Sequence, residues 1–281
     1  MDTTQSLFYP LAIISGLSSA LFWYSYHFEM SKNTVVQYGG EEIGILKATS
    51  TFAATLGPFI GGLALTYFSF NFLFIASSIL LLASVYPLFK AHDIKPRNSF
   101  KLSYLKPDKQ RNRLYTAFIA IGTRSSGLDI VYPLFVFYIL GNYFEIGVLA
   151  SIMAFVTVAF YLLIGNYVDK KDYLQTLKLG SFLHSISWAI KGFIQNAAHI
   201  FTIGTYSAVS FMFIDLSHGK EVYEFASNTD TSSFLTVREI IVAFSKLFPL
   251  ILFLITESFV ITFTFIAFTM LLYAIPKQKS L

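Results

Sequence analysis

A succession of long apolar runs constrains this chain more than any other feature of its sequence. About nine of them follow one another through the 281 residues, and each has on the order of the 20 residues that a helix needs to cross a bilayer. Backbone groups in lipid must be bonded within their own segment, and these runs are too long for barrel strands. We therefore predict an all-α integral membrane protein whose helices contact the lipid bilayer. The predicted spans are 8–28, 43–67, 70–89, 114–140, 147–164, 174–193, 199–216, 234–255 and 259–275.

The composition supports this prediction and excludes other classes of protein. Hydrophobic residues make up 55% of the chain and charged residues only 13%, whereas a soluble domain carries about a quarter charged residues. The formal net charge of +4 would suit nucleic acid, but the basic residues fall into loops, so we expect no nucleic-acid partner. The absence of cysteine excludes disulfides, thiolate metal sites and a cysteine nucleophile.

Lysine and arginine predict the orientation of the spans. Most of the 20 basic residues fall on one side when alternate loops are assigned to the same side of the membrane. Such an excess marks the cytoplasmic side, so we expect a multi-pass protein of the plasma membrane with a cytoplasmic C-terminus and an external N-terminus. The residues on this side are Lys32, Lys90, Lys95, Arg97, Lys101, Lys106, Lys109, Arg111, Arg113, Lys170, Lys171, Lys178, Lys220, Arg238, Lys277 and Lys279.

A basic stretch divides the spans into two sets. Residues 90–113 contain Pro96 and Pro107 and read as a solvated cytoplasmic linker between three spans in 1–89 and six in 114–281. Its charge suits a topology signal that contacts anionic lipid, and a specific partner site is the alternative. The last three spans also echo the first three at a lag of about 185 to 200 residues, a weak internal repeat.

Two short motifs carry a resemblance to a known family. The second span contains Gly57-Pro58-Phe59-Ile60-Gly61-Gly62, and the fifth span is followed by Gly165-Asn166-Tyr167-Val168-Asp169-Lys170. These resemble the GPxxGG motif and the GxxxD(R/K) loop motif of the major facilitator superfamily of secondary transporters. The Gly-Arg that usually continues the loop motif is missing, because Lys171-Asp172-Tyr173 stands there.

The resemblance implies a fold and a function. The nine spans would match helices four to twelve of the family's twelve, a partial fold without the first three helices. The family moves small solutes by alternating access, and the GPxxGG motif is typical of its proton-coupled antiporters, so we expect transport of a small organic solute with H⁺, in the direction of export. The missing helices would come from upstream sequence or another chain. The alternatives are a truncated or degenerate protein without transport, and one part of a split transporter.

Ionisable residues within the spans are the first candidates for the transport site. Arg124 and Asp129 in the fourth span are five residues apart, too far around a helix to pair readily with each other. In the family this helix lines the cavity, so both could contact substrate or a coupling ion, with a structural ion pair as the alternative. Lys246 could supply a fixed positive charge, unless it is only locally hydrated. His184 is expected to be a hydrogen-bonded structural residue rather than a proton carrier.

Three further sets complete the expected site. Trp23 and Tyr24 lie near the inner end of the first span and read as interfacial anchors or as rings that stack on substrate. Gly57, Gly61 and Gly62 allow a neighbouring helix to approach, and Pro58 bends its own helix. Gly165, Asp169 and Lys170 would form a gating loop, or else a solvated charged turn.

Enzymatic readings have little support. The sequence has no HExxH, GxSxG or GxxxxGK(S/T) motif and no Cys/His metal spacing. We therefore expect no enzyme activity, no cofactor and no metal site.

Overall fold

The computed structural model describes residues 3–33, 38–90, 100–108, 111–170 and 172–275. Within these ranges the chain is helical and contains no strand. The α-helices are α1 (Thr3–Asn33), α2 (Gly39–Ala54), α3 (Leu56–Tyr67), α4 (Phe70–Val85), α5 (Arg111–Ser126), α6 (Tyr132–Leu140), α7 (Tyr143–Lys170), α8 (Tyr173–Lys191), α9 (Ala197–Ser227), α10 (Thr231–Ser245), α11 (Leu247–Thr256) and α12 (Phe259–Met270). Short turns of other helix types are η2 (Leu88–Lys90), η3 (Leu102–Leu105), the π-helical η4 (Gly127–Val131) and η5 (Leu271–Ala274).

Consecutive elements join into nine rods across the described residues, and each rod corresponds to one predicted span. The composite rods are α2 with α3, α5 with η4 and α6, α10 with α11, and α12 with η5. Four rods are both long and apolar enough to cross a membrane by length and composition: Gly39–Tyr67, Tyr143–Lys170, Ala197–Ser227 and Thr231–Thr256. The fold prediction is therefore confirmed. The seventh span is the exception in its bounds, because α9 continues well past the predicted end at residue 216.

Prolines explain two of the helix breaks. Pro58 lies three residues after the break at Thr55, and Pro249 lies three residues after the break at Lys246. Proline has no N–H to donate and crowds the preceding turn, so the helix is interrupted just before it. The two breaks are separated by 191 positions, as the residue numbers 55 and 246 show. This separation falls inside the interval predicted for the internal repeat.

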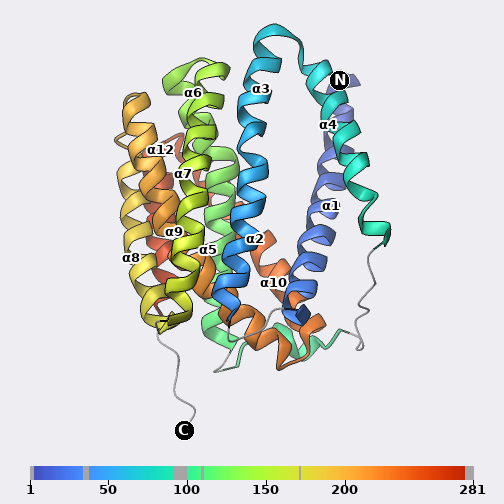
Figure 1. The fold of residues 1–281 in the computed structure, drawn as a ribbon, viewed down its shortest axis with the longest axis vertical. Helices are drawn as coiled ribbons and strands as arrows, with labels where there is room; N and C mark the ends of the chain where they lie inside the picture. The colour runs from blue at the N-terminus through green and yellow to red at the C-terminus, as the bar shows by residue number, and fades with distance from the viewer. Residues whose placement is uncertain (1–2, 34–37, 91–99, 109–110, 171, 276–281) are drawn as a thin grey trace.

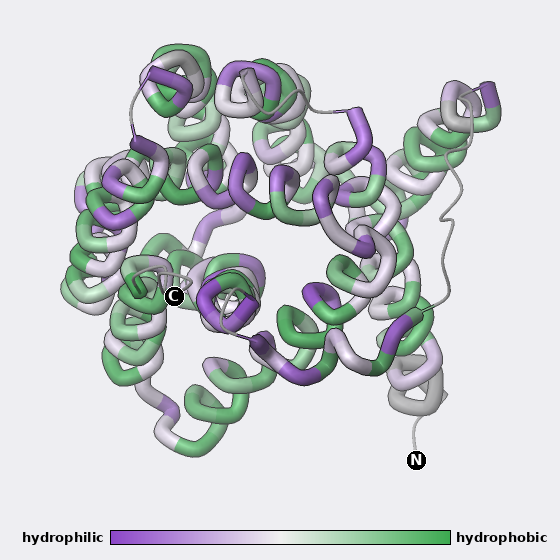
Figure 2. The backbone as a smooth tube through the Cα atoms, turned by 90° about the horizontal axis from the view of Figure 1, so that it is seen from below, coloured by the Kyte–Doolittle hydropathy of each residue, from purple (hydrophilic) through white to green (hydrophobic). Residues whose placement is uncertain are grey.

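The rods form two helical groups, which we call the first group (α1–α4) and the second group (α5–α12). Figure 1 shows α3 beside α7 between the groups, with α1 and α4 on the far side from α8 and α12. The second group holds most of the buried core, including Trp188 and Phe263, whereas no residue of α4 is buried. Seen end-on in Figure 2, hydrophobic segments run along the peripheral helices, as a bilayer requires.

The rod of α2 and α3 packs against α7 through glycines. A Cβ on Gly44 would lie 3.3 Å from the Cα of Gly165, and a Cβ on Gly147 would lie within 2.4 Å of the Pro58 carbonyl oxygen. The Cβ of a residue replacing Gly62 would lie 3.1 Å from the carbonyl oxygen of Tyr143. Small residues at these places let the two backbones touch along the length of both rods.

Within the GPFIGG stretch, Gly62 and the carbonyl of Pro58 face α7, whereas Gly57 and Gly61 face no neighbouring helix. A Cβ at either of the latter two would meet no atom within 4 Å. The reason is helical periodicity: Gly57 and Gly61 are four residues apart and share one face, while Pro58 and Gly62 share the face turned to α7.

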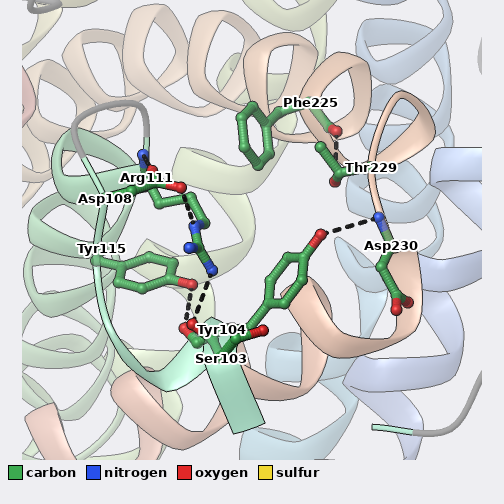
Figure 3. A network of polar contacts seen from close by, with 8 residues as sticks. All are labelled: Ser103, Tyr104, Asp108, Arg111, Tyr115, Phe225, Thr229 and Asp230. Carbon is green, nitrogen blue, oxygen red and sulfur yellow. Dashed lines mark hydrogen bonds and ion pairs between the residues drawn. The ribbon is translucent and has the colours of Figure 1, made fainter. Parts of the chain in front are cut away.

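Part of the predicted linker docks on the second group instead of being wholly solvated. Lys101 pairs with Asp230 at 3.2 Å, and its backbone N–H donates to Ser233 at 2.8 Å. The hydroxyl of Tyr104 accepts from the Asp230 N–H at 3.2 Å, and the Tyr104 carbonyl accepts from Tyr115 at 2.6 Å (Figure 3). Lys95, Pro96, Arg97 and Lys109 of this linker, and Lys171, Lys277 and Lys279, lie outside the described residues.

Candidate site between the two helical groups

The contacts between the groups include a row of hydrogen bonds near the end of α1. The hydroxyls of Tyr24 and Ser232 share a hydrogen bond at 2.9 Å, and His27 Nδ1 lies 2.9 Å from the Tyr223 hydroxyl. Lys32 donates to Thr231 at 3.0 Å. All three bonds use the last third of α1, whereas the side chains earlier in this helix, such as that of Leu17, are largely exposed. We call this the closed end of the molecule.

Asp169 closes the same end on the other side. Its carboxylate accepts hydrogen bonds from the backbone N–H groups of Gly40 at 3.0 Å and Glu41 at 2.7 Å, which lie in the first turn of α2. The carboxylate also pairs with Lys220 of α9 at 2.6 Å. A negative charge at a helix N-terminus is favourable because the free N–H groups and the helix dipole both point at it.

The predicted gating segment is therefore helical, whereas the sequence had indicated a loop. Gly165 and Asp169 lie in the last turns of α7 and not in a loop, and Gly165 allows the close approach of α2. Lys170 is exposed and makes no ion pair among the described residues. Lys220, which sequence reasoning had assigned only to a basic loop, supplies the cation instead.

An ion pair that the sequence did not reveal joins the groups deeper inside. Lys47 of α2 lies 3.2 Å from Asp215 of α9, and the Tyr161 hydroxyl of α7 donates to the same carboxylate oxygen at 3.3 Å. The side chains of Lys47 and Asp215 are 28% and 20% exposed, so both are reachable from the space beside them. With a rise of about 1.5 Å per residue, Lys47 lies roughly 12 Å along α2 from its start and Asp215 roughly 18 Å from the end of α9.

Arg124 lies in the second group and is bound by neutral partners. Its Nε donates to Nε2 of His184 on α8 at 3.1 Å, and its guanidinium carbon lies 3.2 Å from the centroid of the Phe211 ring. As predicted, it does not pair with Asp129, and no carboxylate of the described residues lies within ion-pair distance of it. Its positive charge is therefore stabilised by an imidazole lone pair and an aromatic face.

His184 has the structural role expected of it. Its Nε2 accepts from both Arg124 and the indole N–H of Trp188, each at 3.1 Å, so the ring proton is assigned to Nδ1. Nδ1 lies 3.0 Å from the Ser210 hydroxyl oxygen. Because a proton added to Nε2 would displace two donors beside a guanidinium, this imidazole is unsuited to carrying protons.

Asp129 and Lys246 are not brought into direct contact. Asp129 is exposed and lies in the π-helical turn η4, whose distortion precedes Pro133. Lys246 is partly exposed at the break between α10 and α11. Asp129 makes no hydrogen bond or ion pair with any described residue, although Arg124 and Lys246 are close enough to act on it electrostatically.

The aromatic candidates are divided between two roles. Tyr24 bonds Ser232 at the closed end, so it joins the two groups. Trp23 is 40% exposed and stacks on the His27 ring at 5.7 Å between centroids, within a run of aromatic rings on α1. His27 is itself bonded across to the second group, so these rings support the closed end.

Sequence reasoning missed Asp215 because of a misplaced boundary. The predicted seventh span ended at residue 216, and the polar residues His218, Lys220 and Glu221 read as the following loop. In the structure α9 continues to Ser227, so Asp215 lies well inside the rod. Two more buried charges were missed: Glu221 pairs with Arg113, and Lys191 lies over the Trp188 ring at 3.7 Å.

Comparisons with known proteins identify the family. A family model described as Major Facilitator Superfamily matches residues 2–223. The chain belongs to the major facilitator superfamily. Its members are transporters, so this major facilitator chain is a multi-pass membrane protein of a transporter family. A search of curated proteins found no match. Among the described residues, no group of three or more His, Cys, Asp or Glu side chains is placed to hold a metal ion.

Proposed function

We propose that this chain performs secondary active transport of a small organic solute by alternating access, coupled to H⁺. The observation that carries the proposal is the seam between the groups, where hydrogen bonds join one end and the Lys47–Asp215 ion pair lies deeper. Ionisable side chains at membrane depth are costly and are kept where they bind ions, substrates or protons. No catalysed reaction is part of the proposal.

The seam also supports a way of moving. The rod of α2 and α3 touches α7 backbone to backbone at Gly165 and Gly147, so it can act as the line about which the groups rock. The bodies that move would be residues 1–89 and 114–281, connected by 90–113. In the plasma membrane the closed end would face the cytoplasm, with the C-terminus, because the basic residues gather on that side.

Arg124, Asp129 and Lys246 remain proposed contacts for solute or ion, with Trp23 and Tyr24 lining the closed end. The resemblance of the GPFIGG stretch to antiporter motifs favours efflux in exchange for protons. Gly165, Asp169 and Lys170 are the proposed gate, in which Lys220 takes the role first given to Lys170.

Reconstitution tests the proposal. The purified protein is placed in liposomes that contain a pH-sensitive dye, and a panel of anionic, cationic and neutral organic solutes is added with and without a pH gradient. Solute-dependent proton movement is expected, and Asp129→Asn should reduce it if Asp129 contacts the ion. Movement of no solute under either condition would overturn the transport function, and unchanged transport in Asp129→Asn would remove Asp129 from the mechanism.

A second candidate function rests on the exposed first group. No residue of α4 is buried, and the side chains of Leu17 and Leu21 on α1 are 61% and 68% exposed. This uncovered surface favours a first group completed by further helices, either from upstream sequence or from another chain. A chain without them would be a membrane protein that does not transport. Co-purification of a second membrane polypeptide, or transport that appears only when upstream codons are expressed, distinguishes these cases.

A further inference from the structure

The face of α8 that points into the second group is polar, whereas its outer face is apolar. The buried positions recur every three or four residues, and they include Ser181, His184, Ser187 and Lys191. Leu179 and Phe182 lie on the opposite face and are exposed. A helix with this pattern keeps its polar groups away from lipid, so they must find their partners inside the bundle.

Lys191 ends this polar face without a counter-ion. It is 1% exposed and makes no hydrogen bond or ion pair with any residue that the structure describes. Its Nζ lies over two aromatic rings, 3.7 Å from the centroid of Trp188 and 4.5 Å from that of Tyr132. The charged group that acts on Lys191 electrostatically is Arg124, another cation. Ring faces favour an ammonium, but a buried charge without a counter-charge remains costly.

Tyr132 supplies an unused hydrogen-bond donor at the same place. This first residue of α6 is 8% exposed, and its hydroxyl is enclosed without a hydrogen bond to any described residue. A Cβ on Gly204 of α9 would lie 3.7 Å from the hydroxyl oxygen, so the phenol points into the interior of the second group. Lys191 stands over the face of this ring and does not bond its hydroxyl. An ammonium and a phenol thus share one ring, and both lack an acceptor, which is costly for buried donors.

We propose that Lys191 and Tyr132 bind a small monovalent inorganic anion, such as chloride, inside the second group. The anion accepts hydrogen bonds from the Lys191 ammonium and from the Tyr132 hydroxyl, and it supplies the counter-charge that the surrounding side chains lack. Both residues are more than nine-tenths buried, which favours a single-atom ion over an organic solute. The bound anion joins α8 to α6 and stabilises the folded second group by mass action.

The site lies apart from the seam and from the closed end. The helix α8 begins at Tyr173, just after the segment that holds Asp169, and Lys191 lies roughly 27 Å farther along it at a rise of about 1.5 Å per residue. Figure 1 shows α8 on the far side of the molecule from α1 and α4. Asp129 is exposed and acts on Arg124, so it does not replace the anion at Lys191. The inference therefore stands independently of the proposed transport function.

Trp188 provides a direct probe of the site. The chain has two tryptophans, so Trp23→Phe leaves Trp188 as the one indole that fluoresces. Because Trp188 is 0% exposed, bromide in solution cannot collide with its ring, whereas bromide bound beside Lys191 quenches it. The purified protein in detergent is titrated with bromide, with gluconate keeping the ionic strength constant. We expect a saturable loss of Trp188 fluorescence that added chloride reverses.

Four variants are compared on the Trp23→Phe background. Lys191→Met removes the ammonium at similar volume and should abolish the saturable loss, whereas Lys191→Arg keeps the charge and should retain it. Tyr132→Phe removes only the hydroxyl and should raise the half-saturating bromide concentration about tenfold, because a hydrogen bond to an anion is lost. The matched control is Lys178→Met, which removes an exposed lysine of the same helix and should behave like the parent.

The melting temperature gives a second measurement. Replacing gluconate by chloride should raise that of the parent by about 5 °C and leave that of Lys191→Met unchanged. A fluorescence loss that grows linearly with bromide, or that is the same in Lys191→Met and the parent, would overturn the site. Reversal by benzoate and not by chloride would overturn the assignment to an inorganic anion. If Lys191→Met does not fold, an unchanged bromide affinity in Tyr132→Phe would overturn the site.

The two proposals are tested separately. Neither the fluorescence titration nor the melting temperature measures transport, so a protein that moves no solute in liposomes would lose the proposed function and retain the anion site. A protein that transports but shows no saturable response to bromide would do the reverse.

Discussion

At the scale of single residues, the buried charges of the second group are set by their neighbours. Arg113 and Glu221 are 5% and 7% exposed and pair with each other between α5 and α9. Removing one member of such a pair leaves the other charge buried without compensation, which is more destabilising than the loss of the attraction itself. Arg124 avoids the problem differently, through His184 and the Phe211 ring.

The first prediction concerns this pair. Glu221→Gln should lower the free energy of unfolding by about 3–5 kcal/mol, because Arg113 would stay buried without a counter-ion. The measurement is thermal or denaturant unfolding in detergent. Glu145→Gln is the control, since that carboxylate is exposed and should leave stability within about 0.5 kcal/mol. Equal stability of the two variants would contradict the assigned role of the Arg113–Glu221 pair.

At the scale of helices, glycine placement decides which rods touch. Gly147 and Gly61 are both helical glycines, but only the first faces another backbone. An alanine at a helical position is ordinarily more favourable than glycine, by about 0.8–1.0 kcal/mol, so any loss of stability must come from the contact. Comparing alanine substitutions at Gly147 and Gly61 therefore distinguishes the effect of helix–helix packing from that of helix propensity.

The second prediction uses that contrast. Gly147→Ala should destabilise the protein by about 1–3 kcal/mol, because its Cβ would lie 2.4 Å from the Pro58 carbonyl oxygen and force α3 and α7 apart. Gly61→Ala should be neutral or stabilising, because no atom lies within 4 Å. Melting temperatures in detergent measure both. A stabilising Gly147→Ala would show that the two rods are not in backbone contact there.

The third prediction concerns the docked linker at the start of α10. Burial raises the pKa of Asp230, but hydrogen bonds from the Ser233 backbone and from Lys101 outweigh it and hold the pKa below its ordinary value. A lowered folded-state pKa contributes stability that is present above the ordinary pKa and is lost as the pH falls through the folded pKa. Asp230→Ala should therefore destabilise the protein at neutral pH and make little difference in strong acid.

Stability measured against pH in detergent tests this, and Lys101→Ala should weaken the same dependence because one of the bonds to the carboxylate is lost. Asp108, an exposed carboxylate of the linker bonded to Arg111, provides a comparison: Asp108→Ala should leave the part of the curve that Asp230 contributes unchanged. A curve for Asp230→Ala that runs parallel to that of the parent would argue against the lowered pKa.

At the scale of the whole molecule, the two groups are held together at the closed end by a few polar contacts beside one long apolar seam. Asp169 makes two of these contacts, to the N-terminus of α2, and it is paired with Lys220 within the second group. The free-energy cost of replacing such hydrogen bonds by bonds to water is small. A rocking mechanism needs contacts of this kind, because they must break and re-form. The glycine seam between α2, α3 and α7 offers no such exchange, so in the proposed rocking motion it would stay in place.

The fourth prediction follows at this scale. Because the chain contains no cysteine, Ser232→Cys places a single thiol at the closed end, where Ser232 bonds Tyr24. On this background, Asp169→Asn should raise the rate at which the thiol reacts with a maleimide at neutral pH by about tenfold. The reason is that two N–H groups of α2 and the Lys220 ammonium lose a charged acceptor. Lys220→Gln should have a smaller effect in the same direction. Lys170→Gln is the matched control, since Lys170 is exposed and makes no ion pair among the described residues. An effect of Lys170→Gln as large as that of Lys220→Gln would contradict the assignment.

The sequence by itself determined the helical membrane class, the nine spans and the interruption of the second span at Pro58. Apolar length and the missing N–H of proline act locally, so they can be read from the chain order alone. It also indicated that Arg124 and Asp129 would not pair, which follows from helix geometry. The family followed from two motifs and was confirmed by the match over residues 2–223.

Only the tertiary structure decided which side chains meet. The polar residues after Asp215 have the composition of a loop, but in the structure they continue α9 and pack among the neighbouring helices. This packing places Asp215 inside the rod, opposite Lys47. Tertiary packing also decides that Asp169 pairs with Lys220 and not with Lys170. It likewise decides that Gly57 and Gly61 face no neighbouring helix. A contact between residues 168 positions apart, such as that of Lys47 with Asp215, depends on how whole rods are rotated against one another, and no local pattern encodes that rotation.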